Sequence, residues 1–319
     1  MNSTTAMVET VRFRNAWNAV SVMPPLFILG HYRHGTTHLQ NLLSLDERFA
    51  FPNMYQVSYP HSFLTTEAAN SKIANFFVPR KRPFDNVPLG MEVPYEDEIA
   101  MASSARVSPY LALVFPRRSE YYDGHLSFRN ATAADISRWQ NALVTFLRKL
   151  TLKTAKPLIL KSPPHTARIR LLLGLFPDAK FVHIRRNPCE VYKSTIKMIE
   201  SGSRWTRLQK DEFDVVRRTV SGYREMYDAY FEDRESIPSG HLHEIAFEDL
   251  NEHPLEQIRE MYVALELPEF SEVEHRIRKY VDSIAGYQRN RLPQLNDQEA
   301  NLLRKEWPRC FEEWGYSLP

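Results

Sequence analysis

The sequence predicts an α/β fold of three layers, in which a central parallel sheet is flanked by helices on both faces. Three short apolar runs have the length of buried strands: Leu26–Leu29, Pro157–Leu160 and Lys180–Arg185. Between and after them, apolar residues recur at helical spacing. This alternation is typical of parallel sheets joined by right-handed crossovers. Because no interior stretch has the Gly, Ser or Pro content of a linker, we expect one domain over residues 1–319.

The first strand leads into a turn that is bounded by glycines, Gly30–Gly35. A helix then begins near Thr36, as indicated by three leucines at helical spacing, Leu39, Leu42 and Leu43. Backbone N–H groups of such a turn and the positive end of the helix point at one place, where an anion binds. The segment therefore predicts a phosphate-binding loop.

The spacing of this loop is that of the P-loop, GxxxxGK[ST], and predicts a fold of the P-loop type. Thr36 stands where the lysine of that motif belongs, and the cation lies inside the loop as Arg33. No apolar strand ends in the paired acids that would hold magnesium. These departures argue against a metal-assisted triphosphate reaction, and we expect no metal site. A phosphate and a second anionic group held by arginines fit better.

Three cations follow directly after predicted strands, namely Arg33, Lys161 and Arg186. In an open parallel sheet, functional groups collect at the carboxyl ends of the strands. Asn187 and Pro188 then start a helix as cap and first residue. Ser194 lies eight residues after Arg186, which is about 12 Å along a helix. One anionic group lying along this helix could be contacted by both residues.

An acidic run, Glu96-Asp97-Glu98, follows Pro94 and has two interpretations. Acids in the first turn of a helix complement its dipole. Three consecutive carboxylates exceed what a cap needs, so one of them could be catalytic. The aromatic residues of 105–130 suit the wall of an apolar pocket and suit plain core packing equally well.

The composition is that of an ordinary soluble protein, with 43% apolar residues and a net charge of +2. It gives no support for nucleic-acid binding. Two cysteines make no disulfide framework, and no apolar run approaches the length of a membrane span, so we expect a cytoplasmic protein. Residues 1–24 are expected to pack on the domain or on a second subunit, which leaves a homodimer open. Residues 46–130 are expected to supply insertions on the substrate side.

Five motifs in order make the chain resemble the sulfotransferases that use 3′-phosphoadenosine 5′-phosphosulfate (PAPS). They are R-x-G-T-T (Arg33–Thr37), K-x-P-x-H (Lys161–His165), F-P-D-A-K-F-V-H-I-x-R-N-P (Phe176–Pro188), F-E-D-L (Phe247–Leu250) and W-G-Y (Trp314–Tyr316). The acidic run and a basic loop near the C-terminus are similar to the broad bacterial and invertebrate branch of that family.

The resemblance implies a nucleotide site with three parts. The loop would bind the 5′-phosphate that bridges to sulfate, through Arg33, His34, Gly35, Thr36 and Thr37. Arg186 and Ser194 would bind the 3′-phosphate. Arg289 or Arg291 would close over the nucleotide. PAPS would be the donor and adenosine 3′,5′-bisphosphate the product.

The reaction that the resemblance implies is in-line transfer of a sulfuryl group to a hydroxyl or amine. Arg33 and Lys161 would face the leaving phosphate oxygen. The general base would be His165, which follows the strand-end lysine, or one of the carboxylates Glu96 and Glu98, which we favour. The acceptor would be a small molecule with a partly apolar body.

Three other functions remain open at this point. A P-loop kinase would need the lysine and the magnesium-binding acid that this sequence lacks. A non-catalytic module would bind adenosine 3′,5′-bisphosphate without turnover. A lyase of the same fold would use sulfation to drive elimination, and the sequence does not separate it from simple transfer.

Overall fold

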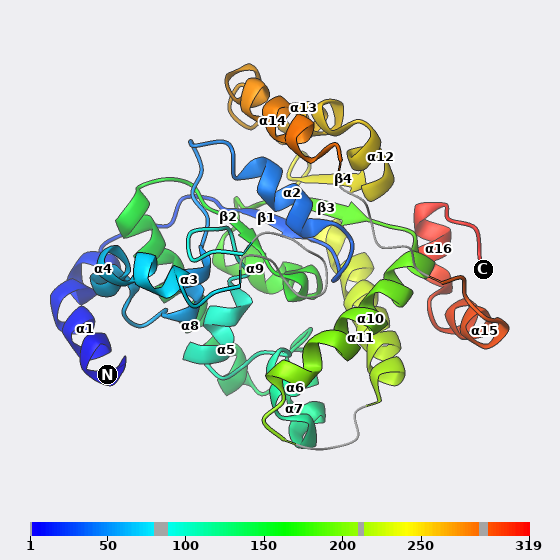
Figure 1. Cartoon of the computed structure of the whole chain (residues 1–319), viewed down its shortest axis with the longest axis horizontal. Coiled ribbons are helices and arrows are strands. Elements are labelled where there is room, and N and C mark those ends of the chain that lie inside the picture. Colours follow the sequence, from blue (N-terminus) through cyan, green and yellow to red (C-terminus); the bar gives the residue numbers. More distant parts are fainter. Residues whose placement is uncertain (1, 80–88, 210–213, 287–292) are drawn as a thin grey trace.

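A computed structural model describes residues 2–79, 89–209, 214–286 and 293–319 of the chain. The four strands in these residues form one parallel sheet in the order β2-β1-β3-β4 (Figure 1). They are β1 (Leu26–Leu29), β2 (Ile159–Lys161), β3 (Lys180–Arg185) and β4 (Leu242–Ala246). The predicted bounds of β1 and β3 agree with the structure. β2 begins two residues later than predicted and includes Lys161.

The register brings the carboxyl ends of the strands to one edge of the sheet. Ile28 of β1 pairs with Lys161 of β2, and Leu29 pairs with His183 of β3. Arg185 at the end of β3 pairs with Ala246 at the end of β4. The segments that follow these four strands therefore begin next to one another at this edge.

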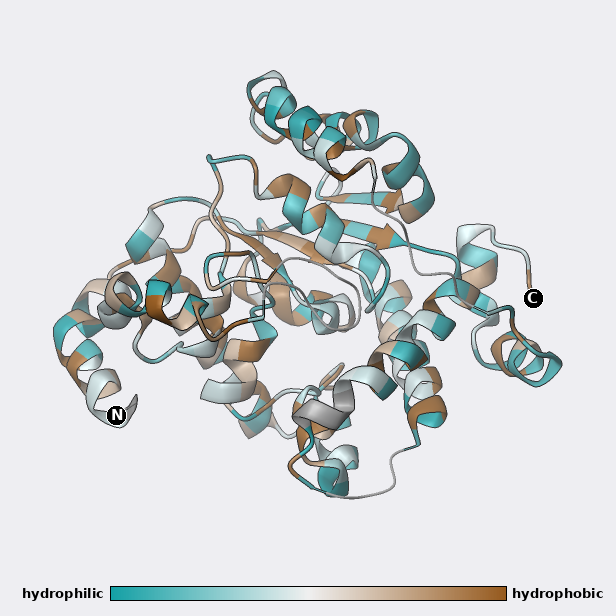
Figure 2. Cartoon of the chain, in the orientation of Figure 1, coloured by the Kyte–Doolittle hydropathy of each residue, from teal (hydrophilic) through white to brown (hydrophobic). Residues whose placement is uncertain are grey.

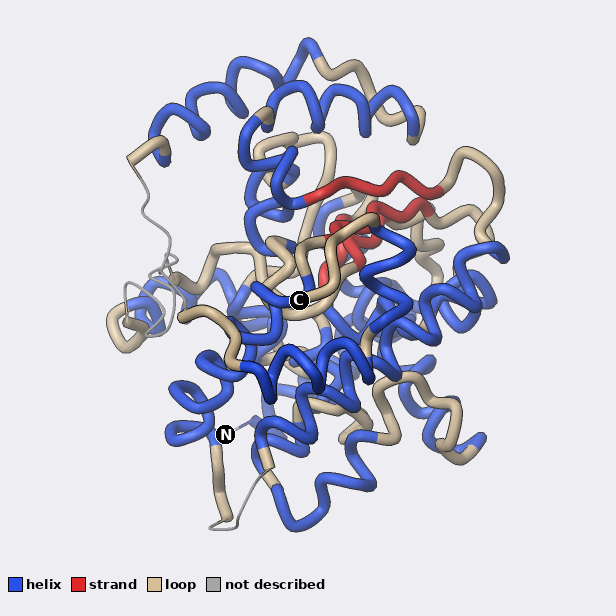
Figure 3. The backbone as a smooth tube through the Cα atoms, turned by 90° about the vertical axis from the view of Figure 1, so that its right-hand side faces the viewer, coloured by secondary structure: helices blue, strands red, loops and turns tan. Residues whose placement is uncertain are grey.

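Both faces of the sheet are buried, as expected for parallel strands covered by helices. One face packs against α8 (Ala133–Thr154), α9 (Ile169–Leu175) and α11 (Val215–Asp233). It presents Phe27, Leu29, Leu160 and Phe181. The other face packs against α2 (Thr36–Leu43), α12 (Phe247–Glu252), α13 (Pro254–Ala264) and α14 (Ser271–Ile284). It presents Leu26, Ile28, Ile159 and Val182. Figures 2 and 3 show the apolar strands enclosed between these helices, which confirms the three-layer α/β/α prediction.

Short helices and loops fill the segment between α2 and α8. These helices are α3 (Met54–Ser58), α4 (Phe63–Asn75), α5 (Glu98–Ser104), α6 (Leu111–Val114), α7 (Ser119–Asp123) and the 3₁₀ turn Pro116–Arg118. After β2 the chain forms a 3₁₀ turn at Pro163–Ala167, and after β3 it forms α10 (Pro188–Thr206). A third 3₁₀ turn, Arg234–Ser236, follows α11, and the chain ends with α15 (Asp297–Glu306) and α16 (Pro308–Trp314).

Several helices begin at residues whose side chains cap them. Thr132 accepts a hydrogen bond from the backbone N–H of Asp135 at the start of α8, which satisfies one orphan donor there. Asn187 accepts from the backbone N–H of Cys189 at 2.9 Å, and Pro188 is the first residue of α10. The predicted start of α10 is therefore correct.

The N-terminal helix α1 (Asn2–Asn18) lies against α4 and α8. Its Glu9 is fully buried and forms an ion pair of 2.8 Å with Lys149 of α8. The same ammonium group lies 4.6 Å from the ring centre of Trp17. Breaking a buried pair of this kind typically costs about 3–5 kcal/mol, so this contact fixes α1 on the domain. Within the described residues, no helix is both long enough and apolar enough to span a membrane.

Candidate active site

The phosphate loop joins the central strand β1 to α2, and its conformation depends on two glycines. Gly30 has φ +141° and Gly35 has φ +95°. A Cβ atom on Gly30 would lie 2.8 Å from the carbonyl oxygen of Ile184, and one on Gly35 would lie 2.3 Å from the ring of Phe247. Both positions therefore exclude any side chain, because the backbone conformation and the space each forbid it. The first residue of the loop is held by a hydrogen bond, because the N–H of Gly30 donates to Thr166 Oγ1 at 2.8 Å.

Three residues that were predicted to bind the nucleotide lie close together at this loop: Arg33, Arg186 and Ser194. Arg33 has φ +68°, and its Nε donates to Ser194 Oγ on α10 at 2.8 Å. Arg186, between β3 and α10, donates from Nη1 to the carbonyl oxygen of Arg33 at 2.8 Å. The guanidinium of Arg186 also lies 4.3 Å above the ring centre of Phe247. Residues 161 positions apart in the chain thus form one polar cluster at the end of β1 and β3.

Lys161 lies at the end of β2, next to β1. Its Nζ lies 2.6 Å from Oε1 of Glu96, and the hydroxyl of Tyr110 donates to the other oxygen of that carboxylate. The Glu96 side chain is 21% exposed, whereas the Lys161 side chain is 3% exposed. The ring of Tyr110 lies 5.9 Å from that of Tyr32 in the phosphate loop. Glu96 is therefore the carboxylate of the acidic run that reaches both solvent and the strand-end lysine.

The next residue of the acidic run points into the protein. Asp97 accepts from His165 Nε2 at 2.6 Å and from Ser162 Oγ at 3.0 Å. Ser162 in turn accepts from the backbone N–H of Glu98 at 2.9 Å. Burial by itself raises the pKa of Asp97, but the charge of His165 and these hydrogen bonds outweigh it, so the pKa lies below its usual range. All of these side chains are buried, so His165 orients the acidic run from within.

Glu98 makes a two-pronged ion pair with Arg168, at 2.7 and 3.1 Å, and both side chains are 0% exposed. Arg168 also donates to the carbonyl oxygens of Leu126 and His125, at 3.1 and 2.6 Å. The acidic run after Pro94 was interpreted as the first turn of a helix, but α5 begins only at its last residue, Glu98, whose side chain turns inward. Of the three candidate bases, the structure leaves Glu96 at the sheet edge and encloses Glu98 and His165.

The side chain of His34 lies in the core behind the loop. Its Nδ1 is 3.0 Å from the carbonyl oxygen of Ile184, and its ring stacks on Tyr227 at 5.5 Å. Burial and the nearby His31 lower the pKa of His34, and burial lowers that of His31 to about 4. Any contact of His34 with a ligand is therefore left to its backbone.

The two threonines differ in exposure, because Thr36 is buried while Thr37 is partly exposed. Arg289 and Arg291 lie outside the described residues.

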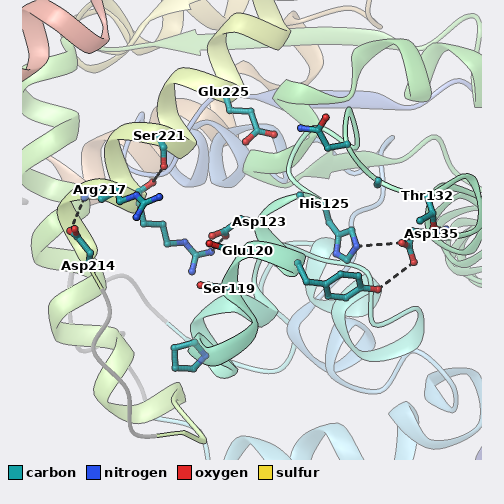
Figure 4. A pocket seen from close by; sticks show the side chains of 16 residues that line it. Ser119, Glu120, Asp123, His125, Thr132, Asp135, Asp214, Arg217, Ser221 and Glu225 are labelled. Atoms are coloured by element: carbon teal, nitrogen blue, oxygen red, sulfur yellow. Dashed lines mark hydrogen bonds and ion pairs between the residues drawn. The ribbon is translucent and has the colours of Figure 1, made fainter.

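A cavity of about 620 Å³ lies between α7, the start of α8 and α11 (Figure 4). Its lining is mixed, and its polar members include Glu120, Asp123, His125, Asp135, Arg217 and Glu225. Of the aromatic residues of 105–130, for which a pocket wall and core packing were both open, Tyr121 lines this cavity and Phe128 is buried in the core. Burial raises the pKa of Asp123 to about 6, against the effect of its partner Arg218 at 2.6 Å.

Arg218 links this cavity to the segment that carries Tyr110. Besides Asp123, it donates to the carbonyl oxygen of Pro109 at 3.0 Å. Burial raises the pKa of the Tyr32 phenol, and the charge of Arg218 is among the effects that oppose the rise. Arg218 and Ser162 had no signal in the sequence, and Tyr110 stood out only as one of the aromatic residues of 105–130, because each acquires its neighbours only when distant segments come together.

The fold is of the P-loop type, with the loop after the central strand and cations at the carboxyl ends of its neighbours. A model described as the sulfotransferase family matches residues 24–272. The chain is 34% identical over 318 residues to the omega-hydroxy-beta-dihydromenaquinone-9 sulfotransferase Stf3 of Mycobacterium bovis, and equally to that of Mycobacterium tuberculosis. The alignment covers 99% of this chain and 81% of those proteins.

Two solved structures share the fold. Sulfotransferase STF1 of Mycobacterium tuberculosis has a TM-score of 0.66 at 16% identity, covering 89% of this chain and 82% of that one. Sulfotransferase STF9 of Mycobacterium avium has a TM-score of 0.66 at 20% identity, covering 97% and 80%. The chain therefore belongs to the sulfotransferase family, and it is an enzyme that moves a sulfuryl group from a sulfate donor to an acceptor.

Proposed function

We propose that the sulfate donor is PAPS and that adenosine 3′,5′-bisphosphate is released. The contact between Arg33 and Ser194 carries this proposal, because it joins the phosphate loop to the flank of α10. A donor with two separate phosphate groups would place its 5′-phosphate on the loop and its 3′-phosphate beside Arg186 and Ser194. Charge-assisted hydrogen bonds from arginine suit both groups.

In the proposed reaction an acceptor oxygen forms a bond to sulfur while the bond from sulfur to the bridging phosphate oxygen breaks. The electron pair of the broken bond stays on that phosphate oxygen. Arg33 and Lys161 stabilise this developing charge, since both lie beside the loop at the sheet edge. Losing one such preorganised donor typically costs about 3–4 kcal/mol of transition-state stabilisation.

We assign the general base to Glu96, which takes the proton from the acceptor hydroxyl. Both of its oxygens are oriented, one by Lys161 and the other by Tyr110, and its side chain is partly exposed. Glu98 and His165 are fully buried and are bound to Arg168 and Asp97. These two residues are therefore assigned to positioning, and Glu96 to proton transfer.

The acceptor is proposed to be a small molecule with a hydroxyl group and a partly apolar body. The relative Stf3 supports this class, because its name specifies an omega-hydroxy-beta-dihydromenaquinone-9 as its acceptor. The cavity beside α7 and α11 would hold a polar part of the acceptor, since Arg218 donates to the carbonyl oxygen of Pro109, and the adjacent Tyr110 contacts Glu96. A homodimer and a cytoplasmic location stay predictions from the sequence.

The donor is tested by thermal denaturation with adenosine 3′,5′-bisphosphate or ADP, each with and without magnesium. A ligand at a hundredfold excess over its Kd stabilises by about 2.7 kcal/mol. We expect this stabilisation for the 3′-phosphorylated nucleotide without magnesium and a smaller effect for ADP. In Arg186→Ala the preference should disappear, while Lys279→Ala, an exposed residue on α14, should keep it.

Equal stabilisation by ADP and adenosine 3′,5′-bisphosphate would overturn the proposal that PAPS is the donor. Magnesium-dependent turnover of ATP would favour a kinase instead. Tight binding of the 3′-phosphorylated nucleotide without sulfate release to any hydroxyl acceptor would favour a non-catalytic module.

A further inference from the structure

Exposed apolar side chains are concentrated on two adjacent helices at one end of the molecule. Six of the eleven large apolar residues that are exposed in the described part of the chain lie on α1 or at the end of α4. They are Met7, Val8, Val11, Ile73, Phe76 and Phe77. Val11 is 80% exposed, and Phe76 and Phe77 are 89% and 85% exposed. We call these six residues, together with the exposed basic residues of the same helices, the α1–α4 patch.

The helices that carry the patch are held against each other and against the domain. Thr65 near the start of α4 donates its backbone N–H to Glu9 of α1 at 3.0 Å, and Glu9 pairs with Lys149. Figure 1 shows α1 and α4 side by side at the end of the molecule that lies opposite α15 and α16. These contacts therefore hold both helices, and the exposed side chains that they carry, on the rest of the protein.

The charges of the two helices are separated by sign. Both acids are buried and paired, Glu9 with Lys149 and Glu67 with Lys153. The remaining charged residues in the described part of α1 and α4 are all basic and exposed, namely Arg12, Arg14 and Lys72. The patch thus combines protruding apolar side chains with exposed charge of one sign.

We propose that the α1–α4 patch binds the surface of an anionic lipid bilayer. Protruding apolar side chains can enter the headgroup region of a bilayer while neighbouring arginine and lysine side chains face its anionic lipids. Each basic residue near an anionic leaflet contributes about 1 kcal/mol. A second copy of the chain fits less well, because a symmetric contact would bring together two surfaces whose exposed charges have the same sign. An apolar acceptor, as in the proposed function, would be reached from such a surface.

Binding is measured by cosedimentation of the full chain with vesicles of phosphatidylcholine, with or without phosphatidylglycerol. We expect binding to the anionic vesicles, weaker binding to the neutral ones, and loss of the difference at high salt. Replacing Val11, Phe76 and Phe77 together by serine should weaken binding by about tenfold or more. Arg12→Glu with Arg14→Glu should weaken binding to anionic vesicles by at least about fivefold per residue.

Matched substitutions away from the patch are available. Val263 on α13 is 74% exposed, and Lys279 on α14 is exposed. The double variant Val263→Ser with Lys279→Glu should bind vesicles like the unchanged protein. Stabilisation by adenosine 3′,5′-bisphosphate should be the same in all variants, which separates a failure of the patch from a failure of the proposed donor.

Three results would overturn the membrane proposal. The unchanged protein could bind neither kind of vesicle. The control variant could lose as much binding as the patch variants. Sedimentation velocity could show that the serine variant converts a dimer into a monomer, in which case the patch is a subunit interface.

Discussion

Glu96 and Glu98 are two residues apart, yet the structure places them in opposite surroundings. Glu96 is 21% exposed at the carboxyl edge of the sheet, between Lys161 and Tyr110. Glu98 is 0% exposed and is bound through both oxygens to Arg168. The difference arises because α5 begins at Glu98 and sends that side chain inward. Burial and partner, rather than residue type, therefore separate a carboxylate that can meet a substrate from one that holds the fold.

The largest effect is expected on catalysis, from a substitution at the partly exposed Glu96. Glu96→Gln keeps the shape but removes the proposed base, so kcat should fall by about 10²–10⁴. Steady-state rates with a saturating donor measure this, and nucleotide stabilisation should persist in the same protein. A kcat within about threefold of the unchanged enzyme would remove Glu96 from the role of base.

A substitution at the buried Glu98 should instead lower the stability of the protein. Glu98→Gln leaves the charge of Arg168 uncompensated, which should lower the free energy of unfolding by about 3–5 kcal/mol in urea. Adding Arg168→Met to that variant should restore part of the loss, because the buried charge is then gone. A stability unchanged by Glu98→Gln would show that the pair does not hold the acidic run.

A smaller loss of stability is expected from a substitution at Ser162, which contacts both Asp97 and Glu98. Ser162 donates to Asp97 and accepts from the backbone N–H of Glu98. Ser162→Ala strands both partners inside the protein and should cost about 1–3 kcal/mol of unfolding free energy. Ser103→Ala, at an exposed position of α5, is the matched control and should change stability by less than about 0.5 kcal/mol. Equal effects of the two substitutions would contradict the assignment.

The pH dependence of stability tests the phosphate loop itself. Burial lowers the pKa of His31 from 6.5 to about 4, so this side chain is neutral in the folded state and protonates only in the unfolded chain between these values. Stability should therefore fall as the pH drops from about 6.5 towards 4, with His31 contributing up to about 3 kcal/mol. Urea unfolding at several pH values should show a shallower fall in His31→Gln. Parallel curves for both proteins would rule out this contribution.

Much of the fold follows from local patterns in the sequence. The apolar runs of β1 and β3 and the pair Asn187-Pro188 predict their elements correctly. The convergence of Arg33, Arg186 and Ser194 was also expected, because parallel strands end at one edge. Their roles in binding the donor stay predictions, as does the single-domain organisation.

Other features depend on contacts that the sequence does not display. The directions in which Asp97 and Glu98 point are set by contacts with Ser162, His165 and Arg168, which lie more than sixty residues later in the chain. The polar part of the cavity lining likewise arises where α7 meets α11. Such long-range pairs leave no periodic signal, so sequence reasoning kept Glu96, Glu98 and His165 as alternatives.

The central place of β1 in the sheet has a consequence for how the chain is made. β1 starts at residue 26, but its two neighbours start at residues 159 and 180. At about 5–20 residues per second, a ribosome needs on the order of ten to thirty seconds to supply both partners. Until β2 is made, the four buried residues Leu26–Leu29 have no strand on either side, and they lack their second neighbour until β3 follows. The apolar strand that leads into the phosphate loop is therefore unpaired on the nascent chain while more than a hundred further residues are added.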